Sequence, residues 1–261
     1  MAQAMRIHPA AVVHPEARLH ESVEVGPFAV IGPQVHIGAG SKVGPHAVIE
    51  GDTTIGERNR IFQFASVGAE PQDLKYAGEA TRLLIGDDNL IREFTTLHIG
   101  TSGGAGLTRV GNKNLFMAYS HVAHDCTVGS GCVLANSAAL AGHVEVGDHA
   151  ILGGLSAVHQ FTRIGKHAFV AGGAMVGMDV PPYCTAQGDR AELVGLNTVG
   201  LSRHGYTEEQ IGRIKDAYKI LFRSKLGLNE ALSKLQAEHG GHPEIDYLLD
   251  FVTHSQRGLT R

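Results

Sequence analysis

The chain has 261 residues, of which 43% are hydrophobic and 18% are charged, and its formal net charge is −4. Such a composition indicates a globular protein with a buried core, and the negative charge gives no general signal for nucleic-acid binding. The first residues lack the apolar stretch of a signal peptide and no apolar run approaches transmembrane length, so we expect a cytoplasmic protein without a transmembrane segment. The three cysteines have no CxxC spacing and are expected to be reduced and mostly structural.

Large apolar residues recur every six positions along most of the chain. The pattern runs from Ile7 to Val67, resumes from Ile85 to Leu97, and is unbroken from Val110 to Val176. Neither an α-helix, with about 3.6 residues per turn, nor an ordinary strand, with a period of two, produces this spacing. It is typical of a parallel β-helix, in which each hexapeptide supplies one short strand and one corner. We therefore predict a mainly β solenoid over residues 1–186.

The residues beside the apolar positions indicate how the chain turns. Glycine directly follows the apolar residue in many repeats, for example at Gly26, Gly129 and Gly147. Glycine suits corners that need a positive φ or a close approach of two backbones. If three hexapeptides close one triangular coil, residues 18 apart (three times six) lie above one another on the same face. The coil period therefore places side chains that are far apart in the sequence on a common face.

Two interruptions of the period predict loops that project from the solenoid. The first covers residues 69–82 and contains the polar stretch from Pro71 to Tyr76. The second lies near residues 100–109 and is rich in glycine. Long excursions from a regular scaffold are either binding loops or tolerated decoration, and the sequence leaves both possibilities open.

The six-residue period then ends, and residues 187–261 are predicted to form a helical cap domain. Thr207 and Gln210 have the spacing of a capping box at the start of one helix. A second helix is expected over Glu230 to Glu238, before a pair of glycines. A third should begin at Pro243, because proline suits the first position of a helix.

Several histidines fall together when the coil period is applied. The apolar positions Val122, Leu140 and Val158 are 18 residues apart, and Leu97 joins them if the second loop is excluded. The histidines beside these positions are His98, His121, His124, His143 and His159. Such a cluster on one face predicts a functional site there.

The columns of this face suggest a chemistry. His124, Gly142 and Gln160 form one column, and Asp125 and His143 form the next. Acyl transfer to a sugar hydroxyl needs a base with a pKa near neutral, a partner that orients it, and an N–H for the developing oxyanion. His124, Asp125 and Gly142 would supply these three parts.

Two other interpretations remain open from the residues alone. His8, His14 and His20 occupy comparable slots far from the cluster, so any single histidine could be exposed filler. Converging imidazoles could also bind zinc, as in a zinc-dependent hydratase of the gamma carbonic anhydrase type, which is also a hexapeptide prism. The ligand spacing of that class does not match residues 121–126.

Three segments carry a closer family resemblance. They are residues 121–129 (HVAHDCTVG), 72–79 (QDLKYAGE) and 157–161 (AVHQF). Together they resemble the UDP-N-acetylglucosamine O-acyltransferase family, and the similarity covers essentially the whole chain. The resemblance implies a left-handed parallel β-helix with a C-terminal α-helical domain, assembled as a homotrimer with sites between neighbouring prisms.

The resemblance also implies a reaction. An (R)-3-hydroxyacyl group would move from acyl carrier protein to the 3-hydroxyl of UDP-N-acetylglucosamine, which is the first step of lipid A biosynthesis. No metal and no cofactor are expected to take part.

By matched position, the resemblance implies roles for individual residues. His124 would be the general base, Asp125 its partner and Gly142 the oxyanion donor. The pocket for the nucleotide sugar and the acyl chain would be lined by Asp73, Lys75, His98, His121, His143, His159, Gln160, Gly172, Asn197 and Arg203. The family has two adjacent basic residues near the diphosphate, whereas here Arg203 is followed by His204. A neutral imidazole holds phosphate less firmly than arginine does.

Two further predictions concern the acyl donor. Lys215, Lys219 and Arg223 are spaced four apart and would form a basic stripe on the first cap helix, which would dock the acidic carrier protein. A solvated helix face is the alternative. Gly172 is expected on a different face from His124, and the resemblance places there the residue that limits acyl-chain length. Because glycine leaves the groove open, we expect a longer 3-hydroxyacyl chain to be preferred.

Overall fold

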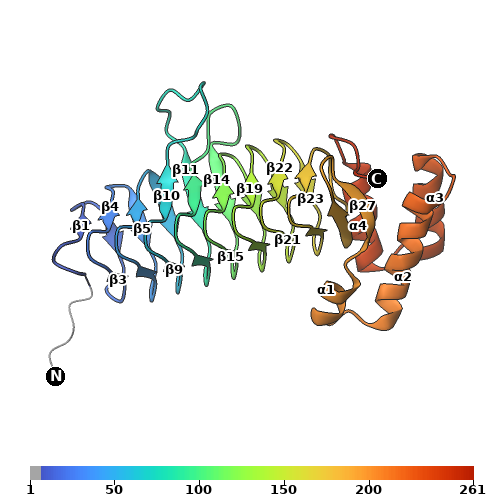
Figure 1. The fold of residues 1–261 in the computed structure, drawn as a ribbon, viewed down its shortest axis with the longest axis horizontal. Coiled ribbons are helices and arrows are strands. Elements are labelled where there is room, and N and C mark those ends of the chain that lie inside the picture. The colour runs from blue at the N-terminus through green and yellow to red at the C-terminus, as the bar shows by residue number, and fades with distance from the viewer. Residues whose placement is uncertain (1–6) are drawn as a thin grey trace.

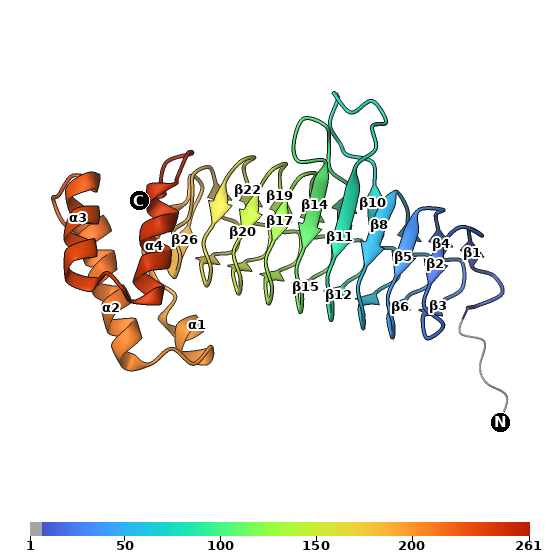
Figure 2. The ribbon, with the colours of Figure 1, turned by 180° about the vertical axis from the view of Figure 1, so that it is seen from behind.

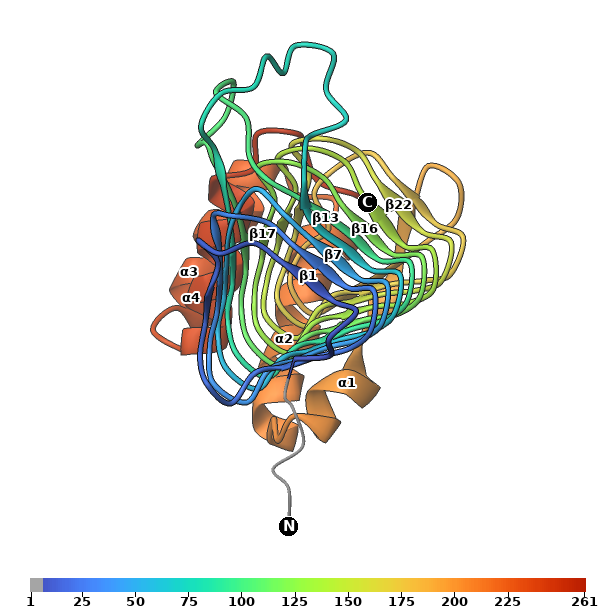
Figure 3. The same cartoon turned by 90° about the vertical axis from the view of Figure 1, so that its left-hand side faces the viewer.

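A prism of three flat parallel β-sheets makes up the larger part of the chain (Figures 1 and 3), in a computed structural model that describes residues 7–261. Each coil contributes one short strand to each sheet, so strands adjacent in a sheet come from successive coils. The coils are left-handed, and the predicted fold class is confirmed.

The strands are distributed over three sheets. Sheet 1 contains β1 (Val12–Val13), β4 (Val30–Ile31), β7 (Val48–Ile49), β10 (Ser66–Ala69), β13 (Thr96–His98), β16 (His121–Val122), β19 (Ala139–Leu140), β22 (Ala157–Val158) and β25 (Met175–Val176). Sheet 2 contains β2 (Arg18–Leu19), β5 (Val35–Ile37), β8 (Asp52–Ile55), β11 (Arg82–Ile85), β14 (Leu107–Val110), β17 (Thr127–Val128), β20 (Glu145–Val146) and β23 (Arg163–Ile164). Sheet 3 contains β3 (Glu24–Val25), β6 (Lys42–Val43), β9 (Arg60–Ile61), β12 (Leu90–Ile91), β15 (Leu115–Phe116), β18 (Val133–Leu134), β21 (Ile151–Leu152), β24 (Phe169–Val170), β26 (Cys184–Gln187) and β27 (Glu192–Leu196).

The register between coils follows the 18-residue spacing. Val122 pairs with Leu140, and Leu140 pairs with Val158. Leu97 pairs with Val122, as predicted once the second loop is excluded. These inward residues are buried, so the core is a continuous column of Val, Ile and Leu along the axis of the prism.

The corners explain why glycine follows the apolar residues. A Cβ on Gly26 would lie 2.9 Å from the backbone nitrogen of Pro45, and one on Gly44 would lie 2.8 Å from that of Gln63. These glycines therefore permit the close approach of successive coils. The positive φ of the corner occurs two residues later, at positions that carry side chains, such as Phe28 with φ of 60°.

The three histidines of the first coil are not filler. The Nδ1 atoms accept hydrogen bonds of 3.1–3.2 Å from amides two residues later: His8 from Ala10, His14 from Glu16 and His20 from Ser22. In the second coil the amide of Phe28 instead donates to the carbonyl of Ala10. The three histidines therefore cap the first coil.

Two loops project side by side from one edge of the prism (Figure 1). The first loop joins β10 to β11 and covers residues 70–81, and the second loop joins β13 to β14 and covers residues 99–106. β14 begins at Leu107, so the end of the segment predicted as loop, residues 100–109, already belongs to sheet 2.

The solenoid continues beyond residue 186. β26 pairs in parallel with β24, and β27 then pairs antiparallel with β26 at the end of sheet 3. The helices form a separate layer beyond this end (Figures 1 and 2). They are α1 (Thr198–Arg203), α2 (Glu208–Tyr218), the π-helical turn η1 (Lys219–Arg223), α3 (Leu228–His239) and α4 (Pro243–Thr253).

The predicted helix starts are present in the structure, together with two short helical elements, α1 and η1, that are not predicted as separate elements. The capping box of Thr207 and Gln210 is present, and Pro243 begins α4. The sequence does not predict α1, which is too short to show an apolar period. It predicts residues 219–223 as part of the first cap helix, whereas they form the π-helical turn η1. Within residues 7–261, no helix is long and apolar enough to cross a bilayer.

Candidate active site

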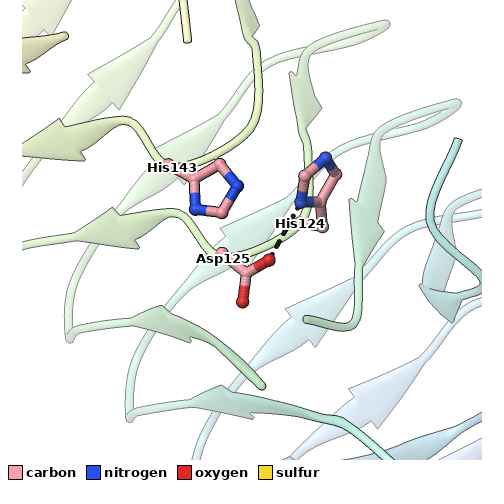
Figure 4. A group of neighbouring side chains, drawn as sticks. All are labelled: His124, Asp125 and His143. Atoms are coloured by element: carbon pink, nitrogen blue, oxygen red, sulfur yellow. Dashed lines mark hydrogen bonds and ion pairs between the residues drawn. The ribbon is translucent and has the colours of Figure 1, made fainter. Parts of the chain in front are cut away.

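His124 lies at the corner between sheets 1 and 2 and pairs with the residue that follows it. Its Nδ1 is 2.9 Å from Oδ2 of Asp125 (Figure 4). Burial alone would raise the pKa of Asp125, but hydrogen bonds from Thr101 and His124 outweigh burial and lower this pKa below its ordinary value. An ionised carboxylate can only accept, so Nδ1 carries the proton and Nε2 keeps a lone pair. The imidazole is therefore held in the tautomer that a general base requires.

Asp125 is enclosed by the second loop. Its φ of 56° turns the side chain under that loop, where only 1% of it is exposed. Oδ2 accepts from the amide of Thr101 at 3.0 Å and from its hydroxyl at 2.6 Å, while the amide of Asp125 donates to Oγ1 of Thr108 at 2.8 Å. A Cβ on Gly104 would lie 2.4 Å from the Asp125 carboxyl carbon. The sequence did not predict Thr101 or Thr108, because the loop interrupts the period that places side chains.

Gly142 lies one coil beyond His124, in the column that the period predicts. A Cβ at this position would lie 2.6 Å from Nε2 of His124, so glycine leaves the space that the ring occupies. Within residues 7–261, the Gly142 amide makes no hydrogen bond to a protein acceptor. The backbone of Gly142, with its unpaired N–H, therefore lies against the ring of His124.

His143 borders the pair on the same corner (Figure 4). Its ring stacks on Phe161 with centroids 4.3 Å apart and meets the His124 ring edge-on at 5.1 Å. Burial lowers the pKa of His143, against the opposite effect of the Asp125 charge. Phe161, which the period does not assign to the site, packs flat against this ring.

His98 and His121 lie beside each other on sheet 1. His121 is 2.7 Å from Oγ1 of Thr96 through its Nδ1, and its ring meets that of His98 at 4.9 Å. His98 is only 3% exposed, and burial lowers its pKa to about 4, with His121 and His124 adding to the effect. His98 is thus neutral at pH 7 and lies beneath the surface formed by its neighbours.

The first loop brings Asp73 to the site. Its Oδ2 is 4.0 Å from Nε2 of His124, and its Oδ1 accepts from the amide of Lys75 at 2.9 Å. Lys75 itself is exposed. A carboxylate from the loop therefore faces the side of the imidazole that is not engaged by Asp125.

His159 and Gln160 are exposed on the next coil. Nδ1 of His159 is 3.1 Å from the carbonyl of Gln160 and 3.2 Å from the guanidinium of Arg257. His159 also lines a largely apolar groove of about 850 Å³ at the end of sheet 1, together with Met175 and Leu259. This groove continues the face that carries the histidine cluster.

Three predicted residues do not lie near His124 in the same chain. Gly172 is at the corner between sheets 3 and 1. Asn197 caps α1 and donates through Nδ2 to the carbonyl of His167 at 3.0 Å. Arg203 is exposed in the last turn of α1, which lies on the side of the molecule away from the two loops (Figure 1).

His204 joins two other imidazoles at the junction of the prism and α1. Its ring centroid is 4.6 Å from that of His149 and 4.9 Å from that of His167. Its Nδ1 is 2.8 Å from the carbonyl of Gly200. Where the family has a second basic residue, this chain therefore has His204, which packs in a cluster with His149 and His167.

The three cations of the predicted stripe line one shallow cavity of about 350 Å³. Lys215, Lys219 and Arg223 are all exposed. Lys219 is 2.9 Å from a carboxylate oxygen of Asp216, and Arg223 donates to the hydroxyl of Tyr218 at 2.7 Å. Their side chains share one side of the helical layer, although η1 alters the helical spacing between the last two.

A metal could be considered, because ligand atoms of His124, Asp125 and His143 lie within 4.8 Å of one another. Oδ2 of Asp125, however, already accepts three hydrogen bonds, two from Thr101 and one from His124. The pair thus orients the two groups toward each other, whereas zinc ligands converge on an ion.

Comparisons with known proteins agree with this geometry. Residues 179–260 match the family model described as Udp N-acetylglucosamine O-acyltransferase, Domain 2, and residues 16–51 and 107–142 match bacterial transferase hexapeptide repeats. The acyl-[acyl-carrier-protein]–UDP-N-acetylglucosamine O-acyltransferase of Myxococcus xanthus is 70% identical over 98% of this chain and 99% of its own.

Solved structures with lower sequence identity share the fold over nearly the whole chain. The UDP-N-acetylglucosamine O-acyltransferase of Moraxella catarrhalis has a TM-score of 0.96 at 45% identity, over 98% of this chain and 100% of that one. The UDP-N-acetylglucosamine acyltransferase of Arabidopsis has a TM-score of 0.84 at 37% identity, with the same coverage. These similarities do not favour the zinc hydratase.

Proposed function

The chain belongs to the UDP-N-acetylglucosamine O-acyltransferase family and is an O-acyltransferase, and from that premise we propose its reaction and the residues that carry it. An (R)-3-hydroxyacyl group moves from acyl carrier protein to the 3-hydroxyl of UDP-N-acetylglucosamine, opening lipid A biosynthesis. The observation that carries the proposal is the His124–Asp125 pair beside the unpaired amide of Gly142.

These groups supply the steps of acyl transfer. Nε2 of His124 takes the proton of the sugar 3-hydroxyl while its oxygen attacks the thioester carbonyl, and Asp125 stabilises the imidazolium. The oxyanion of the tetrahedral intermediate accepts from the amide of Gly142. Collapse breaks the C–S bond, and the imidazolium returns the proton to the carrier thiolate. His98, His121 and His143, whose pKa values burial lowers, add no competing positive charge.

The deciding experiment is a product assay. Purified protein, UDP-N-acetylglucosamine and a series of 3-hydroxyacyl carrier proteins should give the 3-O-acylated nucleotide sugar and free carrier thiol in equal amounts. Thiol release without the acylated sugar would mean that the chain is a thioesterase. If neither product forms with any donor, the proposed reaction is wrong.

We further propose that three chains complete the sites between them. Sheet 1 and sheet 3 meet at a corner that carries a ladder of stacked rings with centroids 4.9–5.2 Å apart: Phe28, His46, Phe64, Phe94 and Tyr119. Phe28 is 57% and Tyr119 60% exposed, a large apolar surface for a single chain. From β12 to β24 the outward side chains of sheet 3 are apolar, among them Leu115, Ile151 and Phe169, whereas β3, β6 and β9 carry Glu24, Lys42 and Arg60.

The two faces differ, so their contact is heterologous and can close into a ring of three. Sheet 3 of one chain would then cover sheet 1 of the next. Gly172 of the first chain, at the corner between its sheets 3 and 1, would reach the apolar groove beyond His124 of the next chain. Asn197 and Arg203 of a neighbouring chain would approach the nucleotide sugar bound at that His124. A cytoplasmic location suits the three buried, unpaired cysteines.

Acyl-chain length provides a test of Gly172. A Cβ there would lie 3.2 Å from the carbonyl oxygen of Gly154, so a side chain fits after a small shift and would project from an exposed position. The wild-type enzyme should prefer the longer 3-hydroxyacyl donor. Gly172→Met should reverse this preference, because each methylene denied burial costs about 0.8 kcal/mol, or nearly fourfold in selectivity.

Competition between long and short donors measures the effect. Gly172→Ala should retain most of the wild-type preference, because its side chain ends at Cβ. If Gly172→Met stays folded and still prefers the long donor, the acyl chain does not end at this corner.

The basic stripe is proposed to dock the carrier protein. Replacing both Lys215 and Lys219 by Glu should raise KM for the acyl donor about tenfold and flatten its salt dependence, with KM for the nucleotide sugar unchanged. Lys234→Glu, on α3 outside this cavity, is the control. Equal KM values for the double variant and the control would reject the docking role and show that the stripe is a solvated helix face.

A further inference from the structure

Two adjacent residues of the second loop, Thr101 and Ser102, donate hydrogen bonds to two different carboxylates. Thr101 donates its amide and hydroxyl to Oδ2 of Asp125, at 3.0 and 2.6 Å. Ser102 donates its amide and hydroxyl to Oε1 of Glu79 on the first loop, at 3.1 and 2.8 Å. One dipeptide therefore touches both the partner of the general base and the loop that brings Asp73 to the site.

The contact with Asp125 fixes the carboxylate from one side. Thr101 is 3% exposed, and the oxygen that it binds is the one that accepts from Nδ1 of His124. The other oxygen, Oδ1, is buried and makes no hydrogen bond to residues 7–261. Because only Oδ2 is hydrogen-bonded, the orientation of the carboxylate about its Cβ–Cγ bond depends on the bonds that this one oxygen accepts. Of the three hydrogen bonds that Oδ2 accepts, the one from the Thr101 hydroxyl is the shortest, so it restrains the carboxylate most strongly.

The contact with Glu79 fixes the first loop. The other carboxylate oxygen of Glu79 accepts from the amide of Ala77 at 2.8 Å, so both of its oxygens are bound within the loop pair. Amides of Ala77 and Ser102 lower the pKa of Glu79 to about 2, which keeps it ionised over the working range. The same loop carries Asp73, 4.0 Å from Nε2 of His124. Loss of the Ser102 contact would loosen this loop without touching Asp125.

We propose that Thr101 is a positioning residue for the general base and Ser102 a positioning residue for the substrate loop. The dipeptide thus divides its effect: Thr101 sets turnover through Asp125 and His124, and Ser102 sets nucleotide-sugar affinity through Glu79. This inference rests on the proposed function, because both effects are defined on the acyl transfer.

Steady-state kinetics of the full-length enzyme test the division. Thr101→Val keeps the shape of the side chain and removes only the hydroxyl, so kcat should fall about tenfold, the worth of one hydrogen bond to a charged group, with KM for the nucleotide sugar nearly unchanged. The acid limb of the pH–rate profile should move to lower pH, because the protonated ring has lost a fixed anionic partner. Thr101→Ser, which restores the hydroxyl, should recover most of kcat.

Ser102→Ala is the matched change one residue away. It should raise KM for UDP-N-acetylglucosamine several-fold and leave the acid limb in place. In an Asp125→Ala background, Thr101→Val should lower kcat by less than twofold further, because its target is gone. A tenfold loss that persists in that background would show that Thr101 acts on folding or elsewhere, and would overturn the inference.

The outcomes separate this inference from the proposed function. Wild-type kcat and pH profile in Thr101→Val, with His124→Ala inactive, would reject the positioning role and leave the reaction intact. Wild-type turnover in both variants would reject the proposed mechanism itself. A KM effect of Thr101→Val equal to that of Ser102→Ala would reject the division between the two residues.

Discussion

His124→Ala should lower kcat by a factor of about 10² to 10⁴, the usual contribution of a general base. This factor corresponds to roughly 3–5 kcal/mol of barrier. The prism should stay folded, because His124 lies at a corner and the buried member of its repeat is Val122. Single-turnover measurement of sugar acylation, with an unchanged circular dichroism spectrum and melting temperature, checks the result.

Two controls accompany this variant. His8→Ala removes a capping imidazole far from the site and should retain wild-type turnover. A chelator should leave the wild-type rate unchanged, and inactivation that added zinc reverses would favour a metal centre. Wild-type turnover in His124→Ala would refute the mechanism.

Gly142→Ala should cost about 100-fold in kcat, although it adds only one carbon. That carbon would lie 2.5 Å from Cε1 and 2.6 Å from Nε2 of His124, far inside van der Waals contact. The ring must move, and a displacement of about 1 Å in a reacting group is worth this factor. The amide of residue 142 remains, so the loss reports the position of the base.

The His124→Ala background identifies the cause. With the ring removed, Gly142→Ala has nothing to displace and should add less than about twofold. Gly212→Ala in α2, where an added Cβ meets nothing within 4 Å, controls for the change of residue type. A 100-fold effect that survives in the His124→Ala background would mean that the added methyl group disturbs the oxyanion amide and not the imidazole.

The sequence predicted those parts of the site that the period places. Each coil returns to the same corner after 18 residues, so His124 and Gly142 could be assigned to one column, and the structure brings them into contact. The period also predicted the face that carries His98, His121 and His143. It could not show that His98 is buried, because the depth of a side chain depends on the rings packed over it.

Other features have no period and could not be predicted in this way. Thr101 lies in a loop whose path is set by tertiary contacts, so nothing in its spacing linked it to Asp125. β27 reverses direction after a turn and extends sheet 3 past the boundary expected at residue 186. Handedness did not follow from the spacing either, because a six-residue repeat is compatible with a coil of either hand, and the prediction rested on the family resemblance.

The capped first coil determines how the prism meets other chains. A row of free amides at the end of a sheet is a template for a foreign strand. At this end, the imidazoles of His8, His14 and His20 occupy three of those amides, and at the other end β27 and the helices lie across the last coil. A variant in which alanine replaces all three histidines has no such acceptors, so it leaves these three amides of the first coil unpaired. Fibrous self-association of that variant should therefore start at its first coil.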